Sequence, residues 1–266
     1  GMCAIHGLTW EYYGKLIKHR LICNSIWEQD PIGWTADSDP GYQSKFRVPQ
    51  IPKYFDSDRI NVKDLKHNLR AKAVLCPGLN IKFFVEETEE KFTWLYQGGV
   101  NEYLSEELKG LDCIPSKPFY GSSRAKNEEV EWSLTWPEEE SEGIQESYVN
   151  LIPTRQGGTH VSGFRSGLVE AIKDFSEYRN LLPRGIKLSP EDVWFGISFI
   201  LSVRLEEPQF TGQTKEKLRS RSATTYVAGV IKDAFTLWLN RHPEAGDQIT
   251  LRAIQNAQKR IKKYKK

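Results

Sequence analysis

The hydrophobic pattern of the chain becomes regular only after residue 60. Apolar residues recur at helical spacing from 62 to 74, and Pro77-Gly78 predicts the end of this helix. Residues 81–85 and 92–96 alternate between apolar and polar side chains, which predicts the two strands of a β-hairpin. Residues 1–50 mix Trp, Pro, Gly and charged residues without a period of 2 or 3.6, so no element is predicted there.

A second region of regular pattern covers the C-terminal half. Alternation over 130–136 places large apolar side chains on one face of a strand. We expect this strand to pair antiparallel with residues 147–153 through the acidic loop 137–143. Helical spacing predicts three further helices, over 164–175, 226–238 and 249–261. The last two lack a strict heptad and are too short for a coiled coil, so they are expected to pack within the chain, with the terminal helix running out of its domain.

Two segments with turn and cap residues interrupt this pattern. Gly157-Gly158 follows a β-like run and predicts a tight reversal into the next helix, because glycine accepts positive φ. Ser189-Pro190-Glu191-Asp192 has the form of a helix start, with Ser as N-cap, Pro next, and a carboxylate three residues after the cap. A strand over 197–201 then leads into the polar loop 206–213, which presents Lys215.

The composition is that of an ordinary globular protein. Of the 266 residues, 39% are hydrophobic and 27% are charged, and the net charge of +2 argues against whole-chain attraction to nucleic acid. The four cysteines (Cys3, Cys23, Cys76 and Cys113) include no CxxC pair. No apolar run approaches the ~20 residues that a membrane span needs. We therefore expect a soluble cytoplasmic protein with reduced thiols, no metal site and no membrane partner.

Two motif-rich stretches carry a family resemblance. YVNLIPTRQGGTHVSGFRSGL (148–168) and LSPEDVWFGISFILSVRLEEPQFTGQTKEKLRSR (188–221) resemble the transducer domain of the B subunit of bacterial type IIA DNA topoisomerases. NLLPRG (180–185) and the Gln-Phe-Thr-Gly that precedes Gln213 are more similar to the topoisomerase IV branch of this family than to gyrase. The resemblance runs from about residue 52 to the C-terminus. The unbroken GGTH and QTK runs disfavour the mismatch-repair and chaperone branches of the same ATPase superfamily.

The resemblance implies an α+β fold in which the end of a Bergerat-type (GHKL) ATPase domain is followed by a transducer domain with the ribosomal-protein-S5 domain-2-like fold. We expect an unmatched leader over 1–51, the C-terminal remnant of the ATPase domain over 52–98, and a transducer domain over 116–266 that ends in a basic helix. A short helix from about 101 to 109 is expected to lead into a Pro-bearing connector (Pro115, Pro118), and the connector is assigned to 99–115. The leader is either an unrelated or mistranslated segment or a divergent one.

The resemblance also implies a function. Such a transducer couples ATP binding and hydrolysis to DNA strand passage, relaxation and decatenation, with a topoisomerase A subunit, a second B subunit and double-stranded DNA as partners. ATP and Mg²⁺ serve the complete enzyme. The magnesium-ligating Asn and the general-base Glu of the family are not found in this sequence, and the family's metal-binding toprim region is not found either. We therefore expect no catalytic residue and an inactive isolated chain. The alternatives are a gyrase B fragment, or a non-catalytic interaction or DNA-binding remnant of a truncated gene.

Lys215 is the first candidate for a binding residue. In the family, the lysine of the QTK loop, here Gln213-Thr214-Lys215, reaches the γ-phosphate of ATP in a neighbouring ATPase domain, and Gln213 lies beside it. Independently, an ammonium group on a flexible stem suits a phosphate, although an ordinary solvated lysine is the alternative. Charges about 4 Å apart attract by ~4 kcal/mol at an effective dielectric near ~20. This corresponds to roughly millimolar affinity at best, so we expect no tight nucleotide binding by this chain alone.

Two further candidates have structural alternatives. His160 suggests acid–base chemistry, but no nucleophile or carboxylate stands at a suitable spacing, so a structural role is expected. The cations Lys259, Arg260, Lys262 and Lys263 suit the C-terminal end of a helix dipole. Because the corresponding helix of the family leads toward the DNA-cleavage core, contacts with DNA phosphates are the second interpretation.

Overall fold

The computed structural model describes residues 16–24, 42–47, 61–85, 88–138 and 143–264, with side chains over 61–85, 88–138 and 143–263. The chain divides into two compact units, Gly1–Tyr103 (unit 1) and Leu104–Lys266 (unit 2). The division falls within helix α2 (Gly99–Glu107), which is close to the short helix expected over 101–109.

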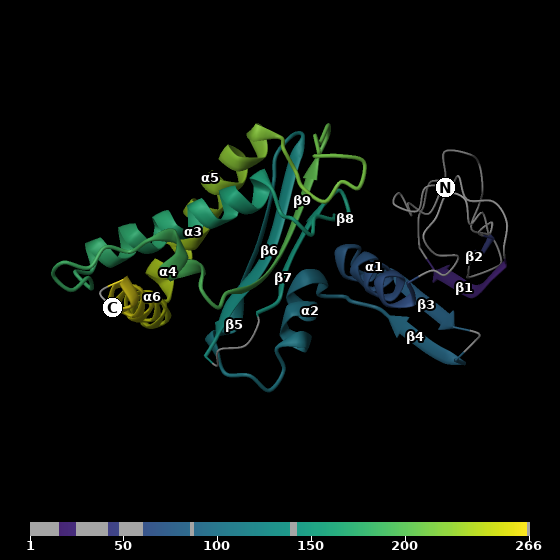
Figure 1. Ribbon diagram of the computed structural model, residues 1–266, viewed down its shortest axis with the longest axis horizontal. Helices are drawn as coiled ribbons and strands as arrows, with labels where there is room; N and C mark the ends of the chain where they lie inside the picture. Colours follow the sequence, from purple (N-terminus) through teal and green to yellow (C-terminus); the bar gives the residue numbers. More distant parts are fainter. Residues whose placement is uncertain (1–15, 25–41, 48–60, 86–87, 139–142, 265–266) are drawn as a thin grey trace. The chain divides into compact units, whose positions relative to one another are not determined.

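Unit 1 contains a four-stranded antiparallel sheet with the order β2-β1-β3-β4 (Figure 1). Its strands are β1 (Leu16–Asn24), β2 (Tyr42–Arg47), β3 (Asn80–Val85) and β4 (Glu90–Trp94). The predicted hairpin of β3 and β4 is confirmed, and Phe83 pairs with Phe92 in it. No element was predicted for β1, which pairs with both β2 and β3. Two strands of this sheet, β1 and β2, therefore come from a region in which no element was predicted.

Helix α1 (Val62–Leu75) has the ends that its sequence predicts. The side-chain oxygen of Asn61 accepts a hydrogen bond from the backbone N–H of Asp64 at 3.2 Å, as an N-cap does. Cys76 closes the helix, and Gly78 follows at φ +87°, a conformation that glycine adopts without a steric cost. Leu69, Ala73 and Val74 are buried, which agrees with the predicted apolar face.

Unit 2 has a five-stranded sheet with the order β5-β6-β9-β7-β8. Its strands are β5 (Cys113–Arg124), β6 (Glu128–Pro137), β7 (Gln145–Val149), β8 (Ile152–Pro153) and β9 (Ser198–Leu205). Strand β6 pairs antiparallel with β5 and β9, whereas β7 pairs parallel with β9 and antiparallel with β8. The predicted α+β class is confirmed.

The predicted antiparallel pairing of 130–136 with 147–153 is wrong, because β9 lies between these strands. The pairs Val130–Val203, Trp132–Leu201 and Leu134–Phe199 put apolar side chains of β6 and β9 opposite one another. Such a long matched face is a better partner for β6 than the five residues of β7.

The last three residues of the expected connector, 113–115, are also the first three of strand β5. Pro115 and Pro118 lie in β5, an edge strand of the sheet, where the missing backbone N–H of proline is tolerated. The β5–β6 register shifts between Ile114 and Phe119, an interval that contains both prolines.

Four helices complete unit 2: α3 (Thr159–Tyr178), α4 (Pro190–Trp194), α5 (Arg221–Arg241) and α6 (Pro243–Tyr264). Helices α3 and α5 run along one face of the sheet (Figure 1). Between these layers lies the core of unit 2, in which Trp132, Trp136, Phe164, Leu168 and Phe235 are almost fully buried.

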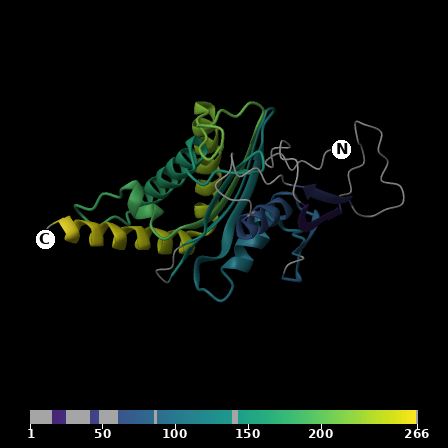
Figure 2. The same cartoon turned by 45° about the vertical axis from the view of Figure 1, so that its right-hand side comes forward.

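The predicted packing of the terminal helix α6 within the chain is confirmed, whereas its expected departure from the domain stays a prediction. The helix contacts α3, α4, α5 and β5, and its residues Ile249, Ala253 and Ala257 are buried. Figure 2 shows this long helix running to the C-terminus. Leu237 of α5 was expected on the buried face, but its side chain is 59% exposed.

Candidate functional site

The loop that follows β9 carries Lys215, and its two arms pair with each other. Phe210 and Leu218 form an antiparallel bridge. The backbone N–H of Thr211 donates to Lys217 O at 2.8 Å, and that of Arg219 donates to Gln209 O at 2.7 Å. These bonds close a narrow hairpin-like loop, called here the Lys215 loop (209–219).

The tip of the Lys215 loop is exposed and contains unusual backbone conformations. Gln213, Thr214 and Lys215 are all exposed, so the predicted candidates Gln213 and Lys215 lie together at the tip. Gly212 has φ +73° and Lys215 has φ +55°. A left-handed conformation costs a non-glycine residue ~1 kcal/mol or more, and it persists where the surroundings enforce it. The tip thus presents an ammonium group from a constrained backbone.

The base of the Lys215 loop is bonded to the Gly157-Gly158 turn. Leu218 N–H donates to Gly157 O, and Thr159 N–H donates to Leu218 O, both at 3.1 Å. Gly158 has φ +135°, and a Cβ there would lie 2.4 Å from Leu218 O. Only glycine permits this approach of the two backbones. The tight reversal predicted for this turn is confirmed, but its contact with the Lys215 loop was not predicted.

A basic groove of about 510 Å³ lies beside this contact. Arg165, Lys217, Arg219 and Arg221 contribute cationic side chains to its lining, whereas Lys215 does not line it. Arg165 donates to the exposed carboxylate of Glu191 at 2.8 Å. This groove was not predicted from the sequence. The clustered cations of 217–221 were visible in the sequence, but their approach to Arg165 depends on the fold.

His160 has the structural role expected from the sequence. Its side chain is fully buried, and Nε2 lies 3.1 Å from the hydroxyl of Thr154. The Thr154 hydroxyl is also 2.7 Å from that of Ser147 on β7. Burial lowers the pKa of His160 to about 4. A neutral imidazole therefore joins the start of α3 to the strand layer.

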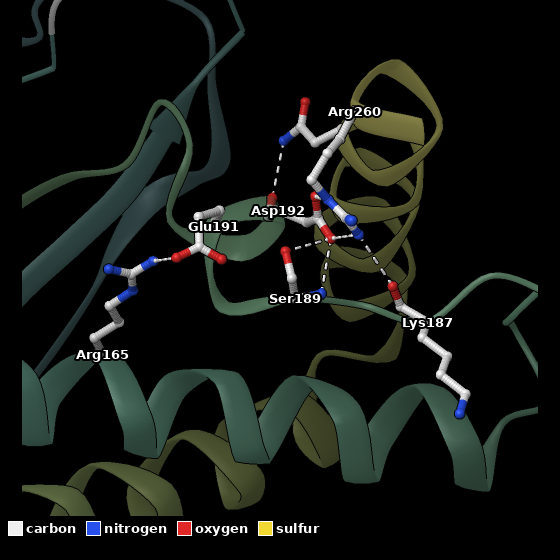
Figure 3. A network of polar contacts seen from close by, with 7 residues as sticks. Arg165, Lys187, Ser189, Glu191, Asp192 and Arg260 are labelled. Carbon is white, nitrogen blue, oxygen red and sulfur yellow. Dashed lines mark hydrogen bonds and ion pairs between the residues drawn. The ribbon is translucent and has the colours of Figure 1, made fainter. Parts of the chain in front are cut away.

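Asp192 and Arg260 form the centre of a polar network between α4 and α6 (Figure 3). The Ser189 N–H and hydroxyl donate to Asp192 Oδ2 at 2.7 and 2.9 Å, which confirms the predicted start of α4. Arg260 donates to both carboxylate oxygens at 2.9 Å, and its Nη2 also contacts Lys187 O at 3.3 Å. Burial opposes ionisation of Asp192, but these hydrogen bonds hold its pKa below the usual value.

The four C-terminal cations proposed for DNA therefore lie in different surroundings. Arg260 is paired with Asp192, while Lys262 and Lys263 are exposed in the last turn of α6. Lys259 lies on the same helix. All four are on an element separate from the Lys215 loop.

In the described ranges, no group of three or more His, Cys, Asp or Glu residues is arranged to hold a metal ion. Nor is any helix of these ranges sufficiently long and apolar to cross a membrane.

Relatives of known identity are similar to most of the chain. The topoisomerase IV B subunit of Pseudomonas aeruginosa is 54% identical over 215 residues, which cover 81% of this chain and 34% of that protein. The Escherichia coli K12 counterpart is 51% identical over 213 residues, which cover 80% of this chain and 34% of that protein. The chain thus spans about a third of the length of these relatives.

Solved structures are similar in fold. The topoisomerase IV ATP-binding domain of Francisella tularensis, solved with a small-molecule inhibitor, has a TM-score of 0.68 at 32% identity and covers 91% of this chain and 69% of its own. The 43K ATPase domain of Thermus thermophilus gyrase B, at 24% identity and a TM-score of 0.69, shares the fold. The family model for DNA gyrase B matches residues 99–266. The chain therefore belongs to the DNA gyrase B family, the B subunits of type IIA DNA topoisomerases, and within it is similar to the topoisomerase IV members.

Proposed function

We propose that this chain is the transducer-bearing part of a topoisomerase IV-type B subunit, in which Lys215 senses ATP held by a neighbouring ATPase domain. The observation that carries the proposal is the exposed, backbone-constrained Lys215 at the tip of an anchored loop. Gln213 lies at the same tip and offers an amide that hydrogen-bonds the same phosphate group.

Lys215 acts as a movable charge in this proposal. Its ammonium contacts the γ-phosphate while ATP is intact and loses that partner when the phosphate leaves. A contact made in one nucleotide state and lost in the other biases the position of the whole element that carries it. Unit 2 then transmits this bias to the DNA-handling parts of the enzyme, which supports strand passage, relaxation and decatenation.

The domain assignment proposed for the chain follows the sequence prediction: leader 1–51, ATPase remnant 52–98, connector 99–115 and transducer 116–266. The partners proposed for the complete protein are a topoisomerase A subunit, a second B subunit and double-stranded DNA, in the cytoplasm. ATP with Mg²⁺ serves the complete enzyme. A gyrase role is less well supported, since the gyrase B protein of Chlamydia pneumoniae is 32% identical, compared with 54% for the Pseudomonas relative.

A chimeric protein tests the proposal. Residues 99–266 of this chain replace the matching segment of the Pseudomonas topoisomerase IV B subunit, and ATP turnover is measured with the A subunit and DNA. We expect Lys215→Ala to lower turnover roughly 10- to 100-fold, the loss of a hydrogen bond to a charged group. Lys217→Ala, in the same loop, is the matched control and should retain turnover. Equal turnover in the two variants would remove Lys215 from the proposed role.

A further inference from the structure

Three glycines of the α3 region lie against one segment of backbone. A Cβ on Gly158, Gly163 or Gly167 would lie 2.4, 2.4 or 2.6 Å from the carbonyl oxygens of Leu218, Thr224 and Ala228, respectively. All three oxygens belong to the segment 218–228, which runs from the base of the Lys215 loop into α5. The backbone of α3 and of the turn before it therefore packs directly against the backbone of residues 218–228, without side chains between them.

Hydrogen bonds also join the start of α3 to the same segment. The reciprocal bonds of Gly157 and Thr159 with Leu218 form a parallel bridge between Gly158 and Leu218. Thr224 Oγ1 donates to Thr159 O at 3.1 Å, so the start of α5 is bonded to the start of α3 as well.

Gln156 is bonded to the Lys215 loop at a position closer to its tip. The backbone N–H of Gln156 donates to Glu216 O at 3.0 Å, and its side-chain amide donates to Glu216 Oε2 at 2.8 Å. Glu216 follows Lys215 directly in the chain. Lys215, whose backbone is left-handed, is therefore followed directly by the anchored Glu216 and preceded three residues earlier by Gly212, which also has positive φ.

We propose that Gly158 and Gln156 are positioning residues for Lys215, which fix its loop to the start of α3. Lys215 then moves with α3 and α5 as one body rather than on a hinged loop. The inference rests on the proposed function, since it concerns how the nucleotide-sensing lysine is held. It assigns to the Gly157-Gly158 turn a role in transmission, because any displacement of Lys215 displaces α3.

Amide hydrogen exchange of the chain tests the anchoring without any nucleotide. Gly158→Ala forces a Cβ against Leu218 at a positive φ, so the protection of the Leu218 and Thr159 amides should fall roughly tenfold or more, as when a hydrogen bond is lost. Gly229→Ala in α5 is the matched control, because an added Cβ there meets no atom within 4 Å apart from its chain neighbours and the local helix backbone. Unchanged protection at Leu218 in Gly158→Ala, or an equal loss in both variants, would overturn the inference.

If Gly158→Ala fails to fold, two variants with smaller changes at Gln156 and Glu216 still test the anchoring of the loop. Gln156→Glu places two carboxylates opposite each other and should lower protection of the loop amides roughly threefold. Adding Glu216→Gln restores an amide–carboxylate pair in which residue 216 carries the amide and residue 156 the carboxylate. This double variant should regain the protection of the loop amides from exchange. Failure of the second change to restore it would contradict a specific Gln156–Glu216 contact.

The chimeric protein separates this inference from the proposed function. If Gln156 acts through Lys215, Gln156→Glu lowers ATP turnover in the parent but has no further effect in Lys215→Ala. A purely structural residue would lower turnover in both backgrounds, and that outcome would overturn the positioning role. Loss of loop protection without any effect of Lys215→Ala would instead reject the proposed function and leave the anchoring intact.

Discussion

His160 shows how burial decides the chemistry of a residue. Its imidazole has no solvent exposure, and the partner of Nε2 is the neutral hydroxyl of Thr154. Desolvation disfavours the charged form of a histidine, which is why its pKa falls to about 4. The unfolded chain, in contrast, takes up a proton near pH 6.5. His160 therefore links the stability of unit 2 to pH.

Replacing His160 with Gln should flatten this pH dependence. Between about pH 6.5 and about pH 4, the unfolded chain binds a proton at His160 that the folded chain does not bind, so stability is lost as the pH falls. The loss amounts to on the order of 3 kcal/mol across the window. Urea unfolding at several pH values in this window measures it for the parent and for His160→Gln. Equal slopes in the two proteins would contradict the assignment to His160.

The Asp192–Arg260 pair should contribute more to stability than a similar pair on the surface. Arg260→Ala leaves a carboxylate whose side chain is 2% exposed without its cation, and a cost of ~2 kcal/mol is expected because the Ser189 hydrogen bonds remain. Arg179 makes comparable bonds to Asp247, but both side chains are 38% exposed, so Arg179→Ala should cost under ~1 kcal/mol. Thermal or urea unfolding compares the two variants. A smaller loss in Arg260→Ala than in Arg179→Ala would argue against the network as a support of α6.

At the scale of elements, local periods predicted the helices and the strands β3, β4, β6, β7 and β9, but not the strands β1, β2 and β5. The helical spacing of 164–175 and the Gly157-Gly158 turn depend on neighbours in sequence, and both were found where expected. Strand pairing depends on distant residues, so the place of β9 between β6 and β7 was not accessible from alternation alone. The same limit applies to the site: Lys215 was predicted from its motif, but its anchor at Gly158 lies far away in the sequence.

The end of α6 is the element proposed to contact DNA. Removing Lys262 and Lys263 by substitution with Ala should lower the slope of log affinity against log salt by about two, since each phosphate contact contributes about 0.9. Fluorescence anisotropy with a short duplex at several salt concentrations measures this slope. Arg124→Ala with Lys126→Ala removes the same charge from exposed positions and is the control. Identical slopes in both double variants would contradict DNA contacts by Lys262 and Lys263 and would favour the interpretation that they are solvated cations at the end of the helix.

For the whole molecule, the question is how much of an ATP site the chain itself provides. It spans about a third of its topoisomerase IV relatives, and its family match begins at residue 99. In the proposed function, the described residues contribute one cation to nucleotide recognition. This cation is Lys215, which lies with Gln213 at the tip of an anchored loop. Adenine recognition and magnesium ligation are then tasks of the neighbouring ATPase domain.

Calorimetric titration of the chain with a non-hydrolysable ATP analogue and magnesium should therefore detect no binding tighter than about millimolar. A single charge pair offers ~4 kcal/mol before desolvation and side-chain ordering reduce it, which sets this limit. Lys215→Ala should give the same flat titration, because the lysine alone does not hold the nucleotide. Micromolar binding that disappears with Lys215→Ala would contradict this division of tasks. It would assign a nucleotide pocket to this chain and make Lys215 a ligand-binding residue in its own right.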